Sequence, residues 1–165
     1  MAAPLRFRRF LEEDARTVAS WRYPDPYSAY DLDPHDIRVI RAMLLPGHNY
    51  HAILEAGEMV GYFCCGDDAR VPGWLYDDDT LDLGMGLRPE LTGQGKGHFY
   101  LQAVIEHVAR QRPGVALRAT IASWNLRAIR MCRRAGFEVA GKFTTTRADQ
   151  TEFAVMVKGC ATAAL

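Results

Sequence analysis

A strand-like segment that leads into a glycine-rich turn constrains the fold of this 165-residue chain more than any other feature. Residues 80–87 alternate polar and apolar side chains, which is typical of a strand, and residues 97–110 repeat apolar side chains at helical spacing. Gly93, Gly95 and Gly97 lie between the two segments. Glycine tolerates positive φ and lets a ligand approach the backbone closely. The pattern therefore predicts a strand, a tight turn and a helix start.

The glycine turn has the properties of an anion-binding site. Amides in the first turn of a helix have no partner inside the helix, and the helix dipole makes that end positive. The turn therefore predicts a backbone site for phosphate. Two nucleotide motifs do not match, because Gly97 follows Lys96 where the Walker motif needs Ser or Thr, and His98 replaces a glycine of the dinucleotide fingerprint. A nucleotide-phosphate enzyme is a remote alternative.

The turn and a second segment together resemble the Gcn5-related N-acetyltransferase (GNAT) family. Residues 92–97 are similar to the acyl-CoA-binding motif of that family, with Thr92 where Gln or Arg is usual. Residues 125–137 resemble the next family motif, a helix that begins at Asn125 and ends in Gly-Phe. Two motifs in the expected order are more specific than either alone. The second segment also resembles aminoglycoside 6′-N-acetyltransferases and ribosomal-protein N-terminal acetyltransferases.

The order of predicted elements agrees with this resemblance. Strands are expected over residues 5–10, 49–56, 58–65, 80–87, 115–121, 137–144 and 151–157, and helices over 12–20, 33–45, 97–110 and from 125. Asp33 is the expected cap of the second helix, because Pro34 follows it as a favourable first helical residue. The resemblance implies one α/β (α+β) domain over residues 1–165, with a mixed, mostly antiparallel central sheet flanked by helices in the order β-α-α-β-β-β-α-β-α-β-β.

Composition and charge fit a globular enzyme with an anionic cofactor. The net charge is zero, so charge gives no reason to expect a nucleic acid or a membrane partner, and no stretch approaches the roughly 20 apolar residues of a membrane span. Residues 67–82 hold six Asp against one Arg, whereas residues 106–134 hold seven Arg against one Glu. The basic segment suits a polyanion such as coenzyme A. A solvated surface with uneven arginines is the alternative interpretation.

The cysteines and the first residues bear on location. Cys64, Cys65, Cys132 and Cys160 have no metal-ligand spacing, so we expect no metal and mostly buried, reduced thiols in a cytoplasmic protein. Residues 1–10 carry arginines but no apolar core and are not typical of a signal peptide.

The resemblance implies acetyl-CoA as co-substrate and direct attack of a primary amine on the thioester. It places the thioester along residues 80–87, with the backbone amide of Leu87 at the carbonyl oxygen. Gly84 and Gly86 are expected to let this strand bulge away from its neighbour and admit the cofactor. The implied cofactor-binding residues are Leu87, Thr92, Gly93, Gln94, Gly95, Lys96, Gly97, Asn125, Arg130 and Arg134.

Two residues are candidates for proton transfer. An alkyl amine has a pKa near ~10.4 and must lose a proton before it attacks. Asp82 lies where related acyltransferases often carry an acid and is the candidate base, acting through water; the alternative is a carboxylate that hydrogen-bonds the backbone at the start of the strand. Cys132 occupies the position of the family's proton-donating tyrosine. A thiol of ordinary pKa, ~8.5, can protonate a thiolate, whereas core filling is the commoner role of a helical cysteine.

The segment between the first two helices is the candidate acceptor site. It contains Trp21, Tyr23, Tyr27 and Tyr30 near several aspartates. Aromatic rings beside carboxylates suit an organic cation, and a packed inter-helix loop is the alternative. The expected acceptor is a small-molecule or peptide amine, and a second copy of the chain is a further candidate partner. Because Thr92 and Cys132 depart from the family pattern, a non-catalytic acyl-CoA sensor is the alternative function.

Overall fold

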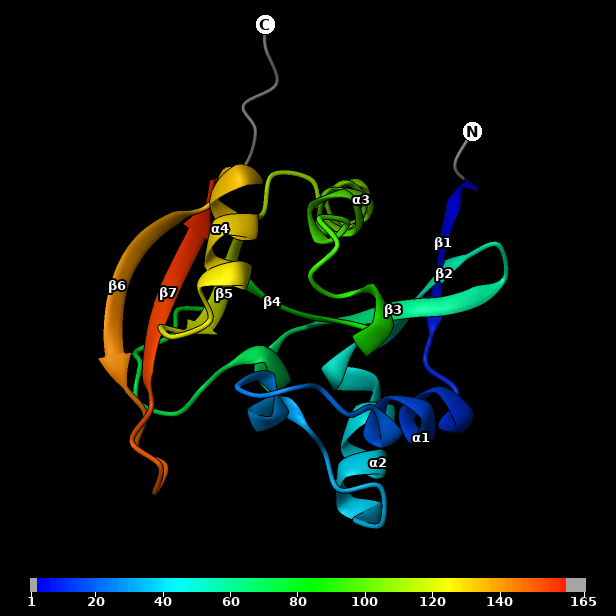
Figure 1. Cartoon of the computed structure of the whole chain (residues 1–165). Helices are drawn as coiled ribbons and strands as arrows, with labels where there is room; N and C mark the ends of the chain where they lie inside the picture. The colour runs from blue at the N-terminus through cyan, green and yellow to red at the C-terminus, as the bar shows by residue number, and fades with distance from the viewer. Residues whose placement is uncertain (1–2, 160–165) are drawn as a thin grey trace, which may run out of the picture.

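The computed structural model describes residues 3–159 as a seven-stranded sheet with helices on both faces (Figure 1). The strands follow the order β1-β2-β3-β4-β5-β7-β6, and β4 and β5 are the parallel neighbours in an otherwise antiparallel sheet. The strands are β1 Leu5–Arg9, β2 His51–Glu55, β3 Glu58–Cys65, β4 Thr80–Leu87, β5 Ala116–Ala122, β6 Glu138–Thr144 and β7 Glu152–Lys158. The helices are α1 Glu12–Ser20, α2 Ile37–Leu44, α3 Gly97–Gln111 and α4 Leu126–Arg134, with 3₁₀ turns η1 Tyr27–Tyr30, η2 Pro46–His48, η3 Asp67–Ala69 and η4 Pro89–Leu91. The predicted fold class and the order of helices and strands are confirmed.

Apolar side chains of the helices are buried on both faces of the sheet. Tyr100 and Val104 of α3 and Ile129 of α4 pack into one cluster, while Val18 of α1 and Ile40 of α2 belong to a second. Figure 1 shows α3 above the sheet and the pair α1 and α2 below it. Removal of these faces from water is the main stabilising term. α4 lies on the same face of the sheet as α3, because Ile129 and Cys132 of α4 belong to the cluster that contains Tyr100 and Val104.

The start of α2 differs from the sequence prediction. The helix begins at Ile37, and the Asp36 carboxylate accepts a backbone N–H of its first turn. Asp33 instead accepts the N–H of His35 at 2.8 Å. Both aspartates can accept an amide in this way, and the residues after Pro34 form a turn rather than the first helical turn. The predicted cap at Asp33 is therefore wrong by one turn.

The glycines of β4 have a different role from the predicted bulge. β3 and β4 pair with no shift in register. A Cβ on Gly84 would lie 3.0 Å from the Cys64 sulfur, and a Cβ on Gly86 would lie 2.5 Å from the ring of Tyr62. The glycines therefore make room for side chains of β3, and the opening in the sheet lies on the other side of β4.

Two further predictions concern membranes and cysteines. Over residues 3–159, no helix combines the length and the apolar character that crossing a bilayer requires. The same residues contain no cluster of His, Cys, Asp or Glu side chains that could hold a metal ion. Cys64, Cys65 and Cys132 are buried and unpaired, and Cys160 lies outside the described residues.

Candidate functional site

The sheet opens between its two parallel strands. β4 and β5 pair only where Thr80–Asp82 runs beside Ala116–Arg118. Beyond that point β4 continues along β3, whereas β5 continues along β7. The strands therefore diverge and leave a wedge-shaped opening, which we call the wedge. Its apex is at Asp82.

The backbone amides of Met85 and Leu87 point into the wedge. Arg88 donates to the carbonyl of Val60 at 2.9 Å, which fixes the alternation of hydrogen bonds between β3 and β4. Every second residue of an antiparallel strand hydrogen-bonds to the neighbouring strand, and the residues that alternate with them direct their backbone N–H and C=O groups to the opposite side. Met85 and Leu87 alternate in this way with the residues of β4 that bond to β3. This is the orientation that the predicted role of Leu87 requires.

Ion pairs close the apex of the wedge. Arg118 of β5 donates to both oxygens of Asp82, at 2.6 and 2.8 Å, and Arg70 donates to one of them at 2.8 Å. Arg118 also reaches Asp77 at 2.7 Å. Asp82 is only 2% exposed. Its carboxylate thus joins β4, β5 and the acidic loop (residues 67–79), and among the described residues its hydrogen-bond donors are arginines rather than backbone amides.

The wedge leads into a pocket of about 710 Å³. The predicted site residues that line it are Trp21, Tyr23, Tyr27, Tyr30, Leu87, Thr92, Gly93, Gly95, Gly97, Asn125, Arg130, Cys132 and Arg134. Gln94, Lys96 and Asp82 are not part of its lining. Both sequence motifs and the aromatic segment between α1 and α2 therefore meet around one cavity.

The glycine turn presents free amides to this pocket. Gly93 and Gly95 have φ of 72° and 76°, so both adopt the left-handed conformation that glycine permits. Within residues 3–159, the amides of residues 93–99 donate no hydrogen bond to the rest of the chain. α3 begins at Gly97, so the positive end of its dipole adds to these donors. The turn fits a diphosphate group.

The side chains of the turn hold its backbone. The Thr92 hydroxyl donates to the Pro89 carbonyl at 2.7 Å, and the Gln94 amide donates to the Glu90 carbonyl at 2.6 Å. Lys96 is exposed to solvent. Anion binding here therefore depends on the backbone amides, and the replacement of Gln or Arg by Thr92 leaves them available.

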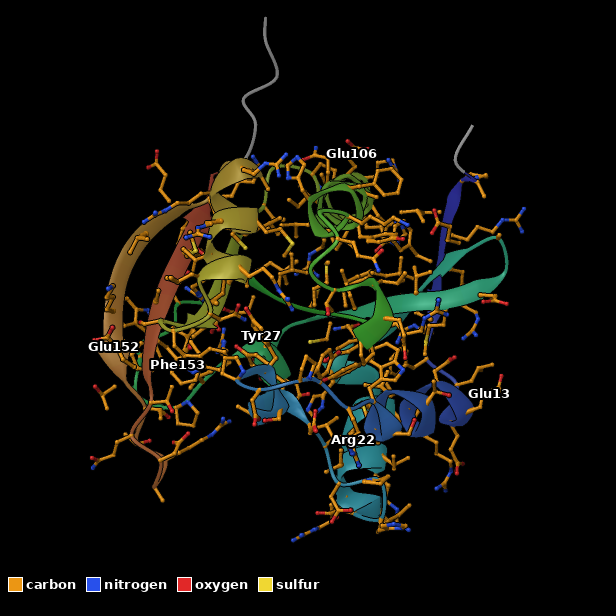
Figure 2. All side chains as sticks on the ribbon, in the orientation of Figure 1. Glu13, Arg22, Tyr27, Glu106, Glu152 and Phe153 are labelled. Atoms are coloured by element: carbon orange, nitrogen blue, oxygen red, sulfur yellow. The ribbon has the colours of Figure 1, made fainter. Side chains whose placement is uncertain are left out.

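Polar and aromatic contacts tie the start of α4 to the segment between α1 and α2. The Asn125 carboxamide oxygen accepts the N–H of Ala128 at 3.1 Å, which confirms the predicted cap, and its NH₂ group donates to the Tyr30 hydroxyl at 3.0 Å. The Arg127 guanidinium lies 4.0 Å from the centre of the Tyr27 ring. Figure 2 shows Tyr27 of η1 near the start of α4. The pocket is thus covered by aromatic side chains.

Cys132 lies in the core beneath the pocket. The residue is 4% exposed, and burial raises the pKa of its thiol to about 12. Transfer of its proton to a thiolate of ordinary pKa, ~8.5, is then unfavourable. These surroundings match the core-filling alternative rather than a proton donor.

Tyr23 extends from the α1–α2 segment to the end of β4. Its hydroxyl donates to the Leu87 carbonyl at 2.6 Å, and its backbone N–H donates to Asp31 at 3.0 Å. Burial raises the pKa of the phenol, so it stays neutral. Trp21 is 8% exposed and packs against Tyr62, with ring centres 6.1 Å apart. Tyr23 therefore places a neutral hydroxyl group in the wedge beside Leu87.

The chain matches the family described as "Acetyltransferase (GNAT) domain" over residues 4–138. It belongs to the GNAT family. The GNAT domain is also 36% identical over 87 residues to an L-methionine sulfoximine/L-methionine sulfone acetyltransferase of Pseudomonas paraeruginosa, over 53% of this chain and 48% of the relative. The chain spans about half the length of the curated relatives it matches.

Solved structures share the fold of this GNAT domain. Aminoglycoside acetyltransferase AAC(6′)-Ib in complex with coenzyme A has a TM-score of 0.71 and 21% identity, with 94% of this chain and 95% of that chain covered. A GNAT-family acetyltransferase from Bacillus anthracis has a TM-score of 0.74 and 14% identity, with 96% of each chain covered. At such identities the likeness concerns the fold alone.

Sequence reasoning missed several residues that line the pocket of the GNAT domain. They are Tyr62, Asp68, His98 and Arg147, among others. The Nδ1 atom of His98 is buried without a hydrogen-bond partner among the described residues. The alternation of β3 places Tyr62 on the same face as Cys64, which was readable from the sequence, whereas Asp68 of the short turn η3 and Arg147 of a loop have no such signal.

Proposed function

We propose that this GNAT domain is an acetyl-CoA-dependent N-acetyltransferase that acts on the primary amine of a small molecule. The observation that carries the proposal is one continuous pocket that joins the free amides of the glycine turn, the inward amide of Leu87 and the aromatic segment. Acetyl-CoA, when bound, supplies an activated acyl group and a thiol leaving group. The rest of the chemistry depends on residues of the chain.

The residues on the cofactor side provide donors and positive charge. The amides of residues 93–99 are suited to the diphosphate of acetyl-CoA. Arg130 and Arg134 are suited to the remaining phosphate group of the same molecule. The Leu87 amide is suited to an oxygen that gains negative charge during transfer. A fixed amide donor inside a closed site stabilises such an oxygen without reorganisation of solvent.

The acidic and hydroxyl groups of the pocket differ from the sequence hypothesis. We assign Asp82 to the apex of the wedge, because both of its oxygens are bonded to arginines. The carboxylates that do line the pocket are Asp31 and Asp68. We assign Cys132 to the core, which leaves Tyr23 as a neutral hydroxyl donor at Leu87.

The names of the relatives support a small-molecule acceptor. One relative acetylates L-methionine sulfoximine and L-methionine sulfone, and a structural neighbour is an aminoglycoside acetyltransferase. The pocket adds two carboxylates and several aromatic rings on the acceptor side. We also place the protein in the cytoplasm, because Cys64, Cys65 and Cys132 are buried, unpaired thiols.

Calorimetric titration with acetyl-CoA, with ATP as control, tests the proposal. We expect micromolar binding of acetyl-CoA and none of ATP. Release of free CoA is then measured with L-methionine sulfoximine, L-methionine sulfone, kanamycin and a peptide with a free N-terminus. Turnover of a small amine supports the proposal. If the peptide is the only acceptor that reacts, the acceptor is a peptide amine rather than a small molecule. Acetyl-CoA binding without turnover of any amine favours the sensor, and no acetyl-CoA binding rejects both functions.

A further inference from the structure

We propose that Tyr62 and Asp68 form the ammonium site of the acceptor, where the phenol oxygen and the carboxylate together hold a compact alkylammonium group over Gly86. The inference rests on the proposed function, since it specifies the acceptor side of the same pocket. Tyr62, Asp68 and Gly86 all line that pocket. We call these three residues the ammonium site.

Tyr62 stands directly over the end of β4. A Cβ on Gly86 would lie 2.5 Å from one ring carbon of Tyr62 and 2.9 Å from its hydroxyl oxygen. Only glycine at this position leaves the ring where it is. Gly86 immediately precedes Leu87, whose amide points into the wedge. The Tyr62 hydroxyl is therefore next to the point where the amine must arrive.

The Tyr62 hydroxyl is free and open to the pocket. Within residues 3–159 it makes no hydrogen bond to another residue, and the buried side-chain atoms without a partner are His98 Nδ1 and Ser123 Oγ. The Tyr62 oxygen is thus accessible rather than sealed in the core. Burial raises the pKa of the phenol, so it is neutral. A neutral phenol oxygen accepts hydrogen bonds from an ammonium group.

Asp68 supplies the negative charge of the ammonium site. Tyr50 stacks on Tyr62, with ring centres 5.8 Å apart, and its hydroxyl donates to Asp68. Burial is the main cause that raises the pKa of both phenols, and the charge of Asp68 contributes to each, which places the carboxylate near both. The Asp68 side chain is 32% exposed, and its second oxygen lies 3.7 Å from His48. A cation in the pocket can therefore reach it.

These groups select the chemistry of the ligand. A primary ammonium group has three N–H donors and one positive charge, which suit a carboxylate, a phenol oxygen and the faces of two tyrosine rings. An alcohol of the same shape has one donor and no charge. The ammonium site should therefore distinguish an alkylammonium ion from the matching alcohol.

Calorimetry on the full chain saturated with coenzyme A tests this inference without turnover. The probes are n-butylamine hydrochloride and butan-1-ol. We expect the wild type to bind the ammonium and not the alcohol. Tyr62→Phe should weaken ammonium binding about fivefold, as loss of one hydrogen bond predicts, and Asp68→Asn about tenfold or more. The affinity for acetyl-CoA should stay within about twofold in both variants, because neither residue belongs to the glycine turn.

A matched control and a second variant keep the test decisive. Tyr100→Phe removes a phenol that donates to Glu55 at 2.8 Å outside the pocket, and it should leave ammonium binding unchanged. Gly86→Ala displaces the Tyr62 ring without removing its hydroxyl and should weaken binding as Tyr62→Phe does. Melting temperatures of all variants identify any that fail to fold.

Two results would overturn the inference. One is equal binding of n-butylammonium by the wild type, Tyr62→Phe and Asp68→Asn. The other is a wild type that binds n-butylammonium no better than butan-1-ol. Failure of the wild type to bind acetyl-CoA would instead reject the proposed function, so the two failures are distinguishable.

Discussion

The cofactor side and the acceptor side of the pocket are built from different parts of the chain. The cofactor side uses mainly backbone amides, in the glycine turn and at Leu87, with Arg130 and Arg134 of α4 beside them. The acceptor side uses side chains that come from the α1–α2 segment, β3 and η3, such as Tyr23, Tyr62 and Asp68. A backbone site tolerates changes of side chain, which explains how Thr92 can replace the usual residue. A side-chain site changes its ligand when one residue changes.

The largest expected effect concerns the ion pairs at the apex of the wedge, outside both sides of the pocket. Asp82→Asn leaves the Arg118 side chain, 3% exposed, without its main partner. We expect a loss of about 3 kcal/mol in the free energy of unfolding, because a buried charge is left poorly compensated. Urea denaturation measures it. Asp78→Asn is the control, since the 93% exposed carboxylate of Asp78 pairs with Arg70 at the surface. This change should lower the free energy of unfolding by less than ~0.5 kcal/mol.

A different result would restore the base hypothesis for Asp82. If Asp82→Asn keeps the stability of the wild type but loses most of its kcat, the carboxylate acts in the chemistry and the comparison between the two sides needs revision. Unchanged kcat in folded protein would place Asp82 in the scaffold alone.

The cofactor side was largely predictable from the sequence because its information is local. Positive φ at Gly93 and Gly95, the Asn125 cap and the helix start at Gly97 all follow from short-range preferences of these residues. The position of the β2–β3 turn follows in the same way from Gly57, whereas the positive φ of Ala56 does not. Such features need no knowledge of distant parts of the chain.

The features that the sequence did not reveal depend on residues far apart in the chain. Asp82 is a candidate base by its position in the family pattern, and nothing near it in sequence reveals Arg118, which lies beside it only when β4 and β5 pair. β4 does part from β5, but no register shift accompanies Gly86 on the β3 side, and the ring that needs the space at Gly86 belongs to Tyr62 on that strand. The ammonium site is of the same kind, since three separate segments form it.

A change in the glycine turn should weaken the cofactor side alone. Gly95 has φ of 76°, and a side chain there costs about 1–2 kcal/mol or moves the amides. Gly95→Ala should therefore raise the Kd for acetyl-CoA about 5- to 30-fold in calorimetry. Gly114→Ala is the matched control, because Gly114 has φ of 77°, has open space around it and lies outside the pocket. Equal effects of both changes would mean that backbone strain alone, and not the turn, sets the affinity.

A change at Tyr23 should affect the acceptor side more than the cofactor side. Tyr23→Phe removes the hydrogen bond to the Leu87 carbonyl, which costs about 1 kcal/mol. We expect the KM for the amine to rise about fivefold in steady-state kinetics, while the Kd for acetyl-CoA changes by less than about twofold. The reverse pattern, with weaker acetyl-CoA binding and an unchanged KM, would assign Tyr23 to the cofactor side.

The smallest expected effect separates core filling from proton donation at Cys132. Cys132→Ala should keep kcat within about twofold and cost about 1 kcal/mol of stability near pH 8. Burial raises the thiol pKa from 9.0 to about 12, so the thiol stabilises the fold below pH 9, and this contribution is lost as pH rises toward 12 because the unfolded chain ionises first. Urea denaturation at pH 8 and pH 10 should therefore show the wild type losing about 1 kcal/mol more than Cys132→Ala over that interval. A kcat reduced more than about tenfold in a variant with this stability profile would identify the thiol as a proton donor, and the transfer step itself would then depend on a side chain of the cofactor side.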